Sequence, residues 1–224
     1  MKYDWILFDA DETLFHFDAF KGMQLMFSRK GIDFTEQDFA HYQTVNKPLW
    51  VDYQDGKITA DELKHTRFTE WAKKLETTTS ELNSSFLDAM ADICTLLPGA
   101  KELIESIHGK AKLGIITNGF TELQAVRLER TGMSHYFDQV IISEQVGVAK
   151  PDAGIFNYAH QKMGLPCKTK ILMVGDNPHS DILGGINFGI ETCWLNTSGA
   201  ADIPGIGPSY KVETLFELKE ILLA

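Results

Sequence analysis

Two aspartates that lie two residues apart follow a short apolar run near the start of the chain. Asp9 and Asp11 come directly after Trp5–Phe8. In an extended chain, residues two apart point the same way, so both carboxylates can project toward one site. Neighbouring carboxylates repel each other, which favours a bound cation or a shared proton. One could act as a nucleophile and the other as a proton shuttle, although an acidic turn that caps the next helix explains the same residues.

A second polar group follows another apolar run. Thr117 and Asn118 come after Leu113–Ile116, and a helical pattern begins near Thr121. A hydroxyl and backbone N–H groups at a helix N-terminus form an anion site, which makes both residues candidates to bind a phosphoryl group. Thr and Asn are also common as helix N-caps, so this motif alone does not decide between the two roles.

A lysine and two further aspartates complete the set. Lys150, before a proline at a strand-to-helix junction, could offset the charge of a phosphate or carboxylate at close range. Asp176 follows the apolar run Ile171–Val174, and Asp181 lies in the same loop. Magnesium prefers oxygen ligands, often one or two carboxylates, so these residues suit a magnesium site. Taken singly, a solvated lysine and a helix cap at Asp181 remain alternatives.

Strands and helices that alternate along the chain would position these side chains. The apolar runs predict strands, and helical patterns lie between most of them. The alternation predicts an α/β fold, a Rossmann-like parallel sheet with helices on both faces, which binds ligands at the carboxyl ends of its strands. The predicted strands are Trp5–Phe8, Leu113–Ile116, Val140–Ile142, Ile171–Val174 and Thr192–Leu195, and the predicted helices include Ala100–His108, Thr121–Thr131 and Ala153–Met163.

The interval 16–97 contains no such strand and is predicted to be helical throughout. Thr59–Glu62 and Thr78–Glu81 both match the capping-box pattern. Leu82, Phe86, Met90 and Ile93 then fall on one helical face, and Pro98 marks the end of the helix. We expect an inserted helical cap domain over 16–97, between the two parts of an α/β core, 1–15 and 98–224. Helices packed on the sheet within one domain are the alternative, but so long an excursion between strand and helix favours the insertion.

Composition excludes several classes of protein. The net charge is −10 with scattered Lys and Arg, whereas a protein that binds a nucleic acid polymer needs a basic face. No apolar run approaches the roughly 20 residues of a membrane-spanning helix. The three cysteines form no C-x-x-C pair, so we expect buried free thiols and a cytoplasmic location. A small phosphomonoester remains a suitable partner, and the chain is expected to be a monomer or a homodimer.

The order and spacing of these groups closely resemble the haloacid dehalogenase superfamily, in its phosphatase branch with a helical cap after the first strand. The combination of D-x-D-x-T, T-N-G, K-P and G-D-x-x-x-x-D is highly specific, and the resemblance covers the whole chain. One departure is Glu12, where many relatives carry glycine. We expect a slightly different turn there, with the chemistry intact.

The resemblance implies a phosphatase that forms an aspartyl-phosphate. Asp9 would be the nucleophile, and Asp11 the general acid and then the general base. Thr117, with Asn118 nearby, would hold the phosphoryl oxygens. Lys150 would steady both the nucleophile and the phosphate.

The resemblance also implies a set of metal ligands. Magnesium would bind to Asp9, to the backbone carbonyl of Asp11, and to Asp176. Asp181 would be an outer partner or an indirect ligand. Manganese or cobalt could serve a site of this oxygen type as well.

The cap stretch Asn46–Trp50 is similar to that of the pyrimidine nucleotidases of the superfamily. This similarity implies hydrolysis of nucleoside monophosphates such as dUMP, dTMP and UMP, including non-canonical pyrimidine nucleotides. Asn46, Lys47, Trp50 and Arg67 are the cap candidates for substrate contact. Trp50 could stack on a pyrimidine, and Arg67 could donate hydrogen bonds. A packed aromatic ring and a solvated charge are equally good interpretations of these residues.

Three other functions use part of this equipment. A haloacid dehalogenase shares the first aspartate, but it gives Asp11 and Asp176 no task. A phosphatase or phosphomutase for sugar phosphates or phosphoglycolate shares the core residues, and only the cap stretch argues against it. A signalling receiver also carries a phosphoaspartate, but it lacks a large helical insertion, and 224 residues are too many for one receiver.

Overall fold

The structure of the protein, a computed structural model, describes residues 1–224 and divides into two compact units. The first, here called the α/β unit, consists of Met1–His16, Thr95–Gly119 and Leu128–Ala224. The second, the helical unit, consists of Phe17–Cys94 and Phe120–Arg127. Each unit therefore contains segments that are distant in the sequence.

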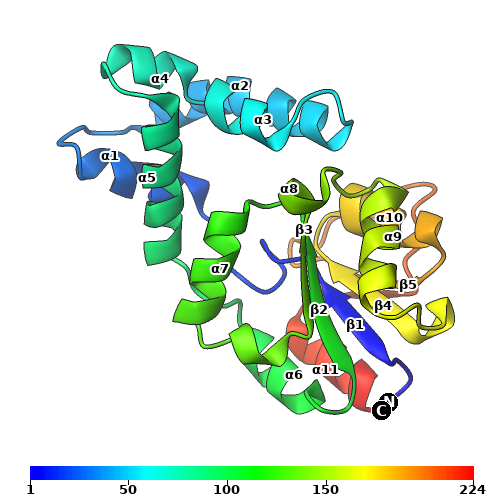
Figure 1. Cartoon of the computed structure of the whole chain (residues 1–224). Coiled ribbons are helices and arrows are strands. Elements are labelled where there is room, and N and C mark those ends of the chain that lie inside the picture. The colour runs from blue at the N-terminus through cyan, green and yellow to red at the C-terminus, as the bar shows by residue number, and fades with distance from the viewer. The chain divides into compact units, whose positions relative to one another are not determined.

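A six-stranded parallel sheet forms the centre of the α/β unit (Figure 1). Its strand order is β3-β2-β1-β4-β5-β6, which places β1 in the interior with β2 on one side and β4 on the other. All four residues of β1 are buried. The strands are β1 (Trp5–Phe8), β2 (Lys112–Thr117), β3 (Gln139–Ile142), β4 (Ile171–Gly175), β5 (Glu191–Leu195) and β6 (Tyr210–Val212).

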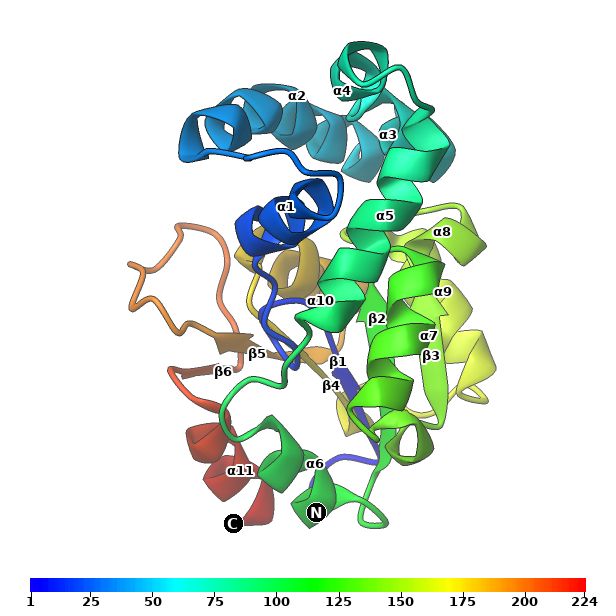
Figure 2. The same cartoon turned by 90° about the vertical axis from the view of Figure 1, so that its left-hand side faces the viewer.

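Helices cover both faces of this sheet. Figures 1 and 2 show α9 (Ala153–Lys162) and α10 (Leu183–Phe188) on one face, and α6 (Ala100–Ile107) and α11 (Leu215–Leu223) on the other. On the first face, apolar side chains of the strands and of α9 and α10 form one buried cluster that includes Leu7, Phe156 and Met173. The predicted Rossmann-like α/β fold is thus confirmed.

The order in which the chain adds strands to the sheet changes direction at β1. After β1 it forms β2 and β3 on one side, and it then crosses to form β4, β5 and β6 on the other. A crevice at the carboxyl ends of the strands is expected at such a switch point. The loops after β1, β2 and β4 all open at this edge, which is where the sequence placed its polar groups.

The helical unit contains α1 (Ala19–Ser28), α2 (Glu36–Gln54), α3 (Ala60–Thr66), α4 (Thr69–Lys74), α5 (Thr79–Asp92) and the first part of α7 (Thr121–Arg130). Figure 2 shows α1 beside α5. The helices pack around an aromatic core in which the ring of Phe27 lies 4.7 Å from that of Phe34 and 4.5 Å from that of Trp71. The inserted helical cap expected from the sequence is thus present, whereas its predicted bounds, 16–97, stay a prediction; the unit also includes Phe120–Arg127, which the sequence predicted to belong to the α/β core.

The two predicted capping boxes differ in the structure. At Thr59 the box is complete, because its hydroxyl and backbone N–H both pair with Glu62. At Thr78 only half of it forms: the hydroxyl accepts from the N–H of Glu81 at 3.1 Å. The Glu81 carboxylate instead pairs with Lys30 at 2.8 Å, a partner that local sequence cannot indicate.

Other details differ from the sequence predictions. Helix α5 ends at Asp92, well before Pro98, and the following segment is extended and forms an antiparallel bridge between Phe15 and Leu96. The short strand β6 was not predicted.

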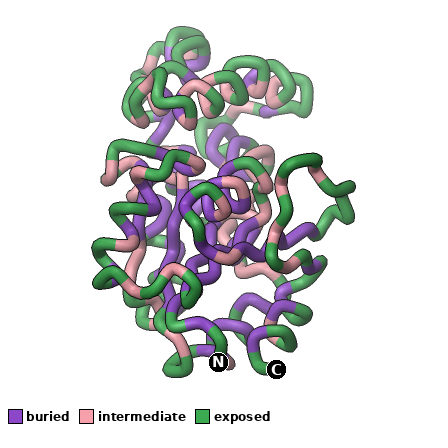
Figure 3. Tube along the Cα trace, turned by 90° about the vertical axis from the view of Figure 1, so that its right-hand side faces the viewer, coloured by how far each residue is buried: buried purple, intermediate pink, exposed green.

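The buried residues lie in the interior of the trace, as Figure 3 shows. None of the helices has the length and apolar character that a membrane-spanning segment requires.

The three cysteines are all free, as expected. Only Cys193 is buried, whereas Cys94 is half-buried and Cys167 is exposed. The expectation that all three thiols are buried was therefore wrong. The cytoplasmic location inferred from them stays a prediction.

Candidate active site

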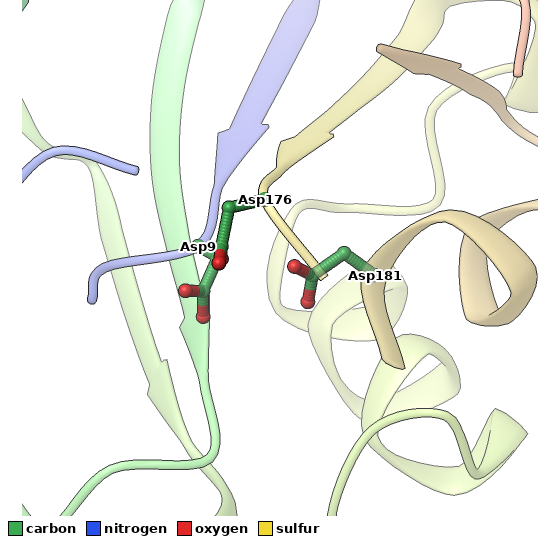
Figure 4. A group of neighbouring side chains, drawn as sticks. All are labelled: Asp9, Asp176 and Asp181. Carbon is green, nitrogen blue, oxygen red and sulfur yellow. The ribbon is translucent and has the colours of Figure 1, made fainter. Parts of the chain in front are cut away.

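Three carboxylates gather at the carboxyl ends of β1 and β4 (Figure 4). The backbone N–H of Asp9 donates to the carbonyl of Val174 at 2.8 Å, so the sheet ladder continues past the end of β1 and fixes this residue. Oxygen atoms of Asp9, Asp176 and Asp181 all lie within 4.8 Å of one another. Hard divalent cations prefer oxygen donors in such an arrangement.

Lys150 joins this group from the loop before α9. Its side chain is 1% exposed, and its ammonium nitrogen lies 2.6 Å from Asp9 Oδ1 and 2.7 Å from Asp181 Oδ1. The third donor of the ammonium reaches the carbonyl oxygen of Ile116 at 2.6 Å. All three donors of the lysine are therefore used, as a buried charge requires.

Asn118 fixes the backbone of that lysine. Its side-chain amide donates to the carbonyl of Lys150 at 2.9 Å, and its oxygen accepts from the N–H of Lys150 at 2.7 Å. The neighbouring Thr117 is buried, and its hydroxyl oxygen accepts from the N–H of Gly119 at 3.0 Å. The side chain of Asn118 thus positions Lys150, while its predicted direct role toward phosphate stays a prediction.

Two residues to which the sequence gave no role hold Asp176. The hydroxyl of Thr13 accepts from the N–H of Asp176 at 3.1 Å and lies 3.4 Å from its carboxylate. The indole N–H of Trp194, on β5, donates to the carbonyl of Asp176 at 2.9 Å. Thr13 ends the D-x-D-x-T motif, which was a usable signal, whereas nothing in the local sequence pointed to Trp194.

Asp181 lies within the turn after β4. Its carboxylate accepts from the N–H of Asn177 at 3.0 Å and from the hydroxyl of Ser180 at 3.1 Å, in addition to Lys150. A Cβ atom at Gly175 would lie 2.2 Å from Asp181 Oδ2, so glycine is required there. The helical turn itself is capped by Asn177, not by Asp181.

Burial and crowding of negative charge shift the pKa values of this cluster. Burial raises the pKa of Asp9 to about 7; the charge of Lys150 opposes this shift, and Asp181 and Asp11 add to it. Burial, then Asp9 and Asp181, raise the pKa of Asp176 to about 8. Burial alone would lower the pKa of Lys150, but Asp181 and Asp9 keep it above its ordinary value. The acids outnumber the lysine, so the cluster fits a bound divalent cation.

Glu12 occupies a left-handed backbone conformation. Its φ is 52°, in a turn where its N–H donates to the carbonyl of Phe15 at 2.7 Å. Glycine adopts this conformation without strain, whereas residues with a Cβ atom adopt it rarely. The carboxylate of this glutamate lies 3.1 Å from His16 Nδ1, and the slightly different turn expected at this position stays a prediction. Asp11 is half-buried beside it.

Two of the four cap candidates contact the same aromatic ring. Trp50 and Arg67 both contact the ring of Phe120, at 5.4 Å between ring centroids and 5.1 Å from the guanidinium carbon. Asn46 instead accepts from the hydroxyl of Tyr42 at 3.1 Å, on its own helix. Lys47 is exposed. Arg67 is 5% exposed, which contradicts its interpretation as a solvated charge.

Comparisons of the sequence and the structure with known proteins identify the family and several relatives. Residues 3–189 match the family model of haloacid dehalogenase-like hydrolases. The chain is 56% identical to the pyrimidine 5′-nucleotidase YjjG of Escherichia coli, over 99% of both chains. It is 35% identical to the pyrimidine 5′-nucleotidase PynA of Streptococcus pneumoniae, over 99% of this chain and 96% of the relative. The crystal structure of the putative HAD-hydrolase YfnB of Bacillus subtilis bound to magnesium has a TM-score of 0.85 and 32% identity, with 99% of both chains covered.

Proposed function

Because the chain belongs to the haloacid dehalogenase-like hydrolases, we propose that it is a magnesium-dependent 5′-nucleotidase for pyrimidine nucleoside monophosphates, with Asp9 as its nucleophile. The observation that carries this proposal is the pairing of the buried Asp9 carboxylate with Lys150 Nζ at 2.6 Å, inside a cluster of three acids. The full-length identity to a pyrimidine 5′-nucleotidase supports the substrate class. The location in the cytoplasm and the state of association, monomer or homodimer, stay predictions.

The proposed reaction has two steps. In the first, an Asp9 carboxylate oxygen forms a bond to phosphorus while the bond from phosphorus to the ester oxygen breaks, and Asp11 gives its proton to that oxygen. In the second, a water oxygen forms a bond to phosphorus while the bond from phosphorus to the Asp9 oxygen breaks, Asp11 takes a proton from the water, and phosphate leaves with the Asp9 carboxylate regenerated. Lys150 holds the Asp9 carboxylate in place, and the hydroxyl of Thr117 is proposed to bind a phosphoryl oxygen.

The acidic cluster provides the ligands for the metal in this proposal. Asp9, Asp176 and the backbone carbonyl of Asp11 would hold magnesium. Asp181 is paired with Lys150 at 2.7 Å, which favours an indirect role for it. When bound, the ion would neutralise negative charge on the phosphoryl oxygens and so ease the approach of the nucleophile. YfnB, which is similar over its whole length, binds magnesium in its crystal structure.

Magnesium is expected to stabilise the protein more strongly at high pH than at low pH. The pKa values of Asp9 and Asp176, about 7 and about 8, lie above that of an unfolded Asp, about 3.9. The metal-free folded state therefore binds more protons than the unfolded state between these values, and its stability falls as the pH rises. Magnesium needs the ionised carboxylates, so its effect grows over the same range. Thermal unfolding with magnesium and with EDTA, at about pH 5.5, 7 and 8.5, measures this effect.

Two variants control that experiment. Asp176→Asn should remove most of the stabilisation by magnesium, because it deletes one proposed ligand. Asp33→Asn, at an exposed position of the helical unit, should retain it. An increase in melting temperature that is the same at all three pH values would contradict the assignment of the metal to these carboxylates.

A substrate panel tests the proposed function directly. We expect phosphate release from dUMP, dTMP and UMP in magnesium, and none in EDTA. Deoxyribose 5-phosphate and phosphoglycolate are expected to be poorer substrates, by about tenfold or more in kcat/KM, because they lack a base. Preference for either base-free ester would retain the phosphohydrolase and overturn the nucleotidase. Release that is unaffected by EDTA would overturn the role of the metal.

A further inference from the structure

The two aspartates whose carboxylates are proposed to bind the metal are held by different kinds of contact. Asp9 is held by the sheet itself, because its N–H donates to the carbonyl of Val174 at 2.8 Å. Asp176 lies one residue beyond the last pair of β4 and β5, Gly175 with Trp194, so the ladder between these strands does not include it. Its position therefore depends on side chains that reach its peptide groups.

Thr13 and Trp194 supply those side chains, one at each peptide group of Asp176. The N–H of Asp176 donates to the hydroxyl of Thr13 at 3.1 Å, and its carbonyl accepts from the indole N–H of Trp194 at 2.9 Å. Thr13 is 0% exposed and Trp194 is 4% exposed, so both hydrogen bonds are made by buried side chains. The two peptide planes that flank Asp176 are thereby fixed, and with them the direction in which its carboxylate leaves the backbone.

The indole ring of Trp194 is itself held by Lys211, its neighbour on β6. Lys211 Nζ lies over the ring, 4.7 Å from its centroid. The same nitrogen lies 2.8 Å from Asp202 Oδ1 and 3.1 Å from the carbonyl oxygen of Ala200, whose backbone is in turn bound by the side chain of Asn196. Because a cation over an aromatic face attracts the ring electrons, β6 and the loop before it help to hold this ring in place.

The acceptor that the buried indole uses connects it to the site. A buried indole N–H needs a hydrogen-bond partner, and the partner of Trp194 is the carbonyl of a proposed metal ligand on the adjacent strand. Phenylalanine would fill most of the same volume but would leave that carbonyl without this donor. Trp194, Asp176, Thr13 and Lys211 all belong to the α/β unit, so the arrangement is complete within one unit.

We propose that Trp194 is a positioning residue for the magnesium ion: its N–H fixes the carbonyl of Asp176 and so holds the carboxylate of Asp176 where the ion binds. Trp194 itself touches neither the metal nor the substrate. Without this hydrogen bond the number of ligands is unchanged, but one of them is less well oriented, so magnesium binds more weakly. Loss of such an outer partner typically lowers metal affinity by about 10–100-fold. This inference rests on the magnesium site of the function proposed above.

Trp194→Phe tests the inference, because it keeps an aromatic ring and removes the N–H donor. We expect the Kd for magnesium, measured from the rise in melting temperature with magnesium concentration, to increase about tenfold. The melting temperature in EDTA separately measures any loss of packing. A lower melting temperature in EDTA together with an unchanged Kd would overturn the inference, because the indole would then have a structural role only.

Trp5→Phe is the matched control. It makes the same exchange at a position that is also 4% exposed, in β1 at the end of the strand opposite the site. We expect its Kd for magnesium to stay within about twofold of that of the unmodified protein. An increase in Kd as large as that of Trp194→Phe would show that any exchange of a buried tryptophan weakens the site, which would also overturn the inference.

Phosphate release from dUMP distinguishes positioning from catalysis. Trp194→Phe should need about tenfold more magnesium for half-maximal activity, because its defect lies in metal binding. At saturating magnesium its kcat should return to within about threefold of the normal value. A kcat that stays far below this value at saturating magnesium would overturn the positioning role.

The indole N–H resonance of Trp194 provides a measurement that needs no variant of this residue. The chain has four tryptophans, so the resonance can be assigned by elimination, with Trp5→Phe, Trp50→Phe and Trp71→Phe. Magnesium should shift it in nitrogen–proton correlation spectra of the unmodified protein, and should not shift it in Asp176→Asn. A resonance that does not move at saturating magnesium would contradict the inference even if Trp194→Phe failed to fold.

Failure of this inference and failure of the proposed function are distinguishable. If magnesium stabilises the unmodified protein and Trp194→Phe with the same Kd, the inference is wrong and the proposed function stands. An unmodified protein whose melting temperature does not respond to magnesium overturns both. A Kd about tenfold higher in Trp194→Phe supports the inference even if the unmodified enzyme prefers a base-free ester, because the metal site is independent of the substrate.

Discussion

Asp9→Asn is expected to lower phosphate release from every substrate by at least about 10⁴-fold in kcat/KM, because it removes the oxygen atom proposed to attack phosphorus. The amide keeps the size of the carboxylate and is a poor nucleophile. The measurement is phosphate release under magnesium, with enzyme concentrations high enough to detect a residual rate. Activity above about one hundredth of the normal value would contradict a covalent role for this residue.

The same variant should fold well. Burial raises the pKa of Asp9 to about 7, which means that its ionised form is disfavoured in the metal-free protein. Asparagine removes that charge while Lys150 keeps Asp181 as its partner at 2.7 Å, so the metal-free variant should be at least as stable as the unmodified protein at pH 8. Asp4→Asn is the matched control, because Asp4 is exposed and lies before β1, at the opposite end of the strand from the site. It should alter neither activity nor stability.

The sequence predicted the parts of this fold that local pattern determines. The runs at Trp5–Phe8 and Ile171–Val174 are buried on both faces of a parallel sheet, so they are continuously apolar and easy to recognise. The motif residues follow these runs directly, and the parallel sheet brings them to one edge. The three-residue strand β6 has no such run, because Tyr210 is half-buried and Lys211 is exposed.

The contacts that refine the site could not be predicted, because each depends on residues that are distant in the sequence. Asn118 and Lys150 pair through their amide and backbone groups across 32 positions. Trp194 holds the carbonyl of Asp176 from the neighbouring strand. Arg67 lies against three rings, one of which, Phe120, comes from a segment that directly follows the T-N-G motif. Composition and spacing say nothing about such pairings.

Lys150→Met is expected to combine a loss of activity with a large loss of stability. The side chain is 1% exposed and pairs with Asp9 and Asp181, at 2.6 Å and 2.7 Å. Removing one partner of a buried ion pair leaves uncompensated charge, which costs about 3–5 kcal/mol in the free energy of unfolding. Denaturant unfolding in EDTA measures this cost. Lys110→Met, an exposed lysine of the same unit, is the control and should change stability by less than about 0.5 kcal/mol.

The pH dependence of that loss identifies its cause. Lys150 opposes the rise in the pKa of Asp9, so its removal should raise this pKa further. A proton can then replace the lost cation at low pH, and the variant should be less impaired at about pH 5.5 than at about pH 8. A loss of stability that is equal at both pH values would instead indicate a packing defect from the changed shape of the side chain. The buried lysine would then contribute to the site through its volume, and the electrostatic role given to it here would be wrong.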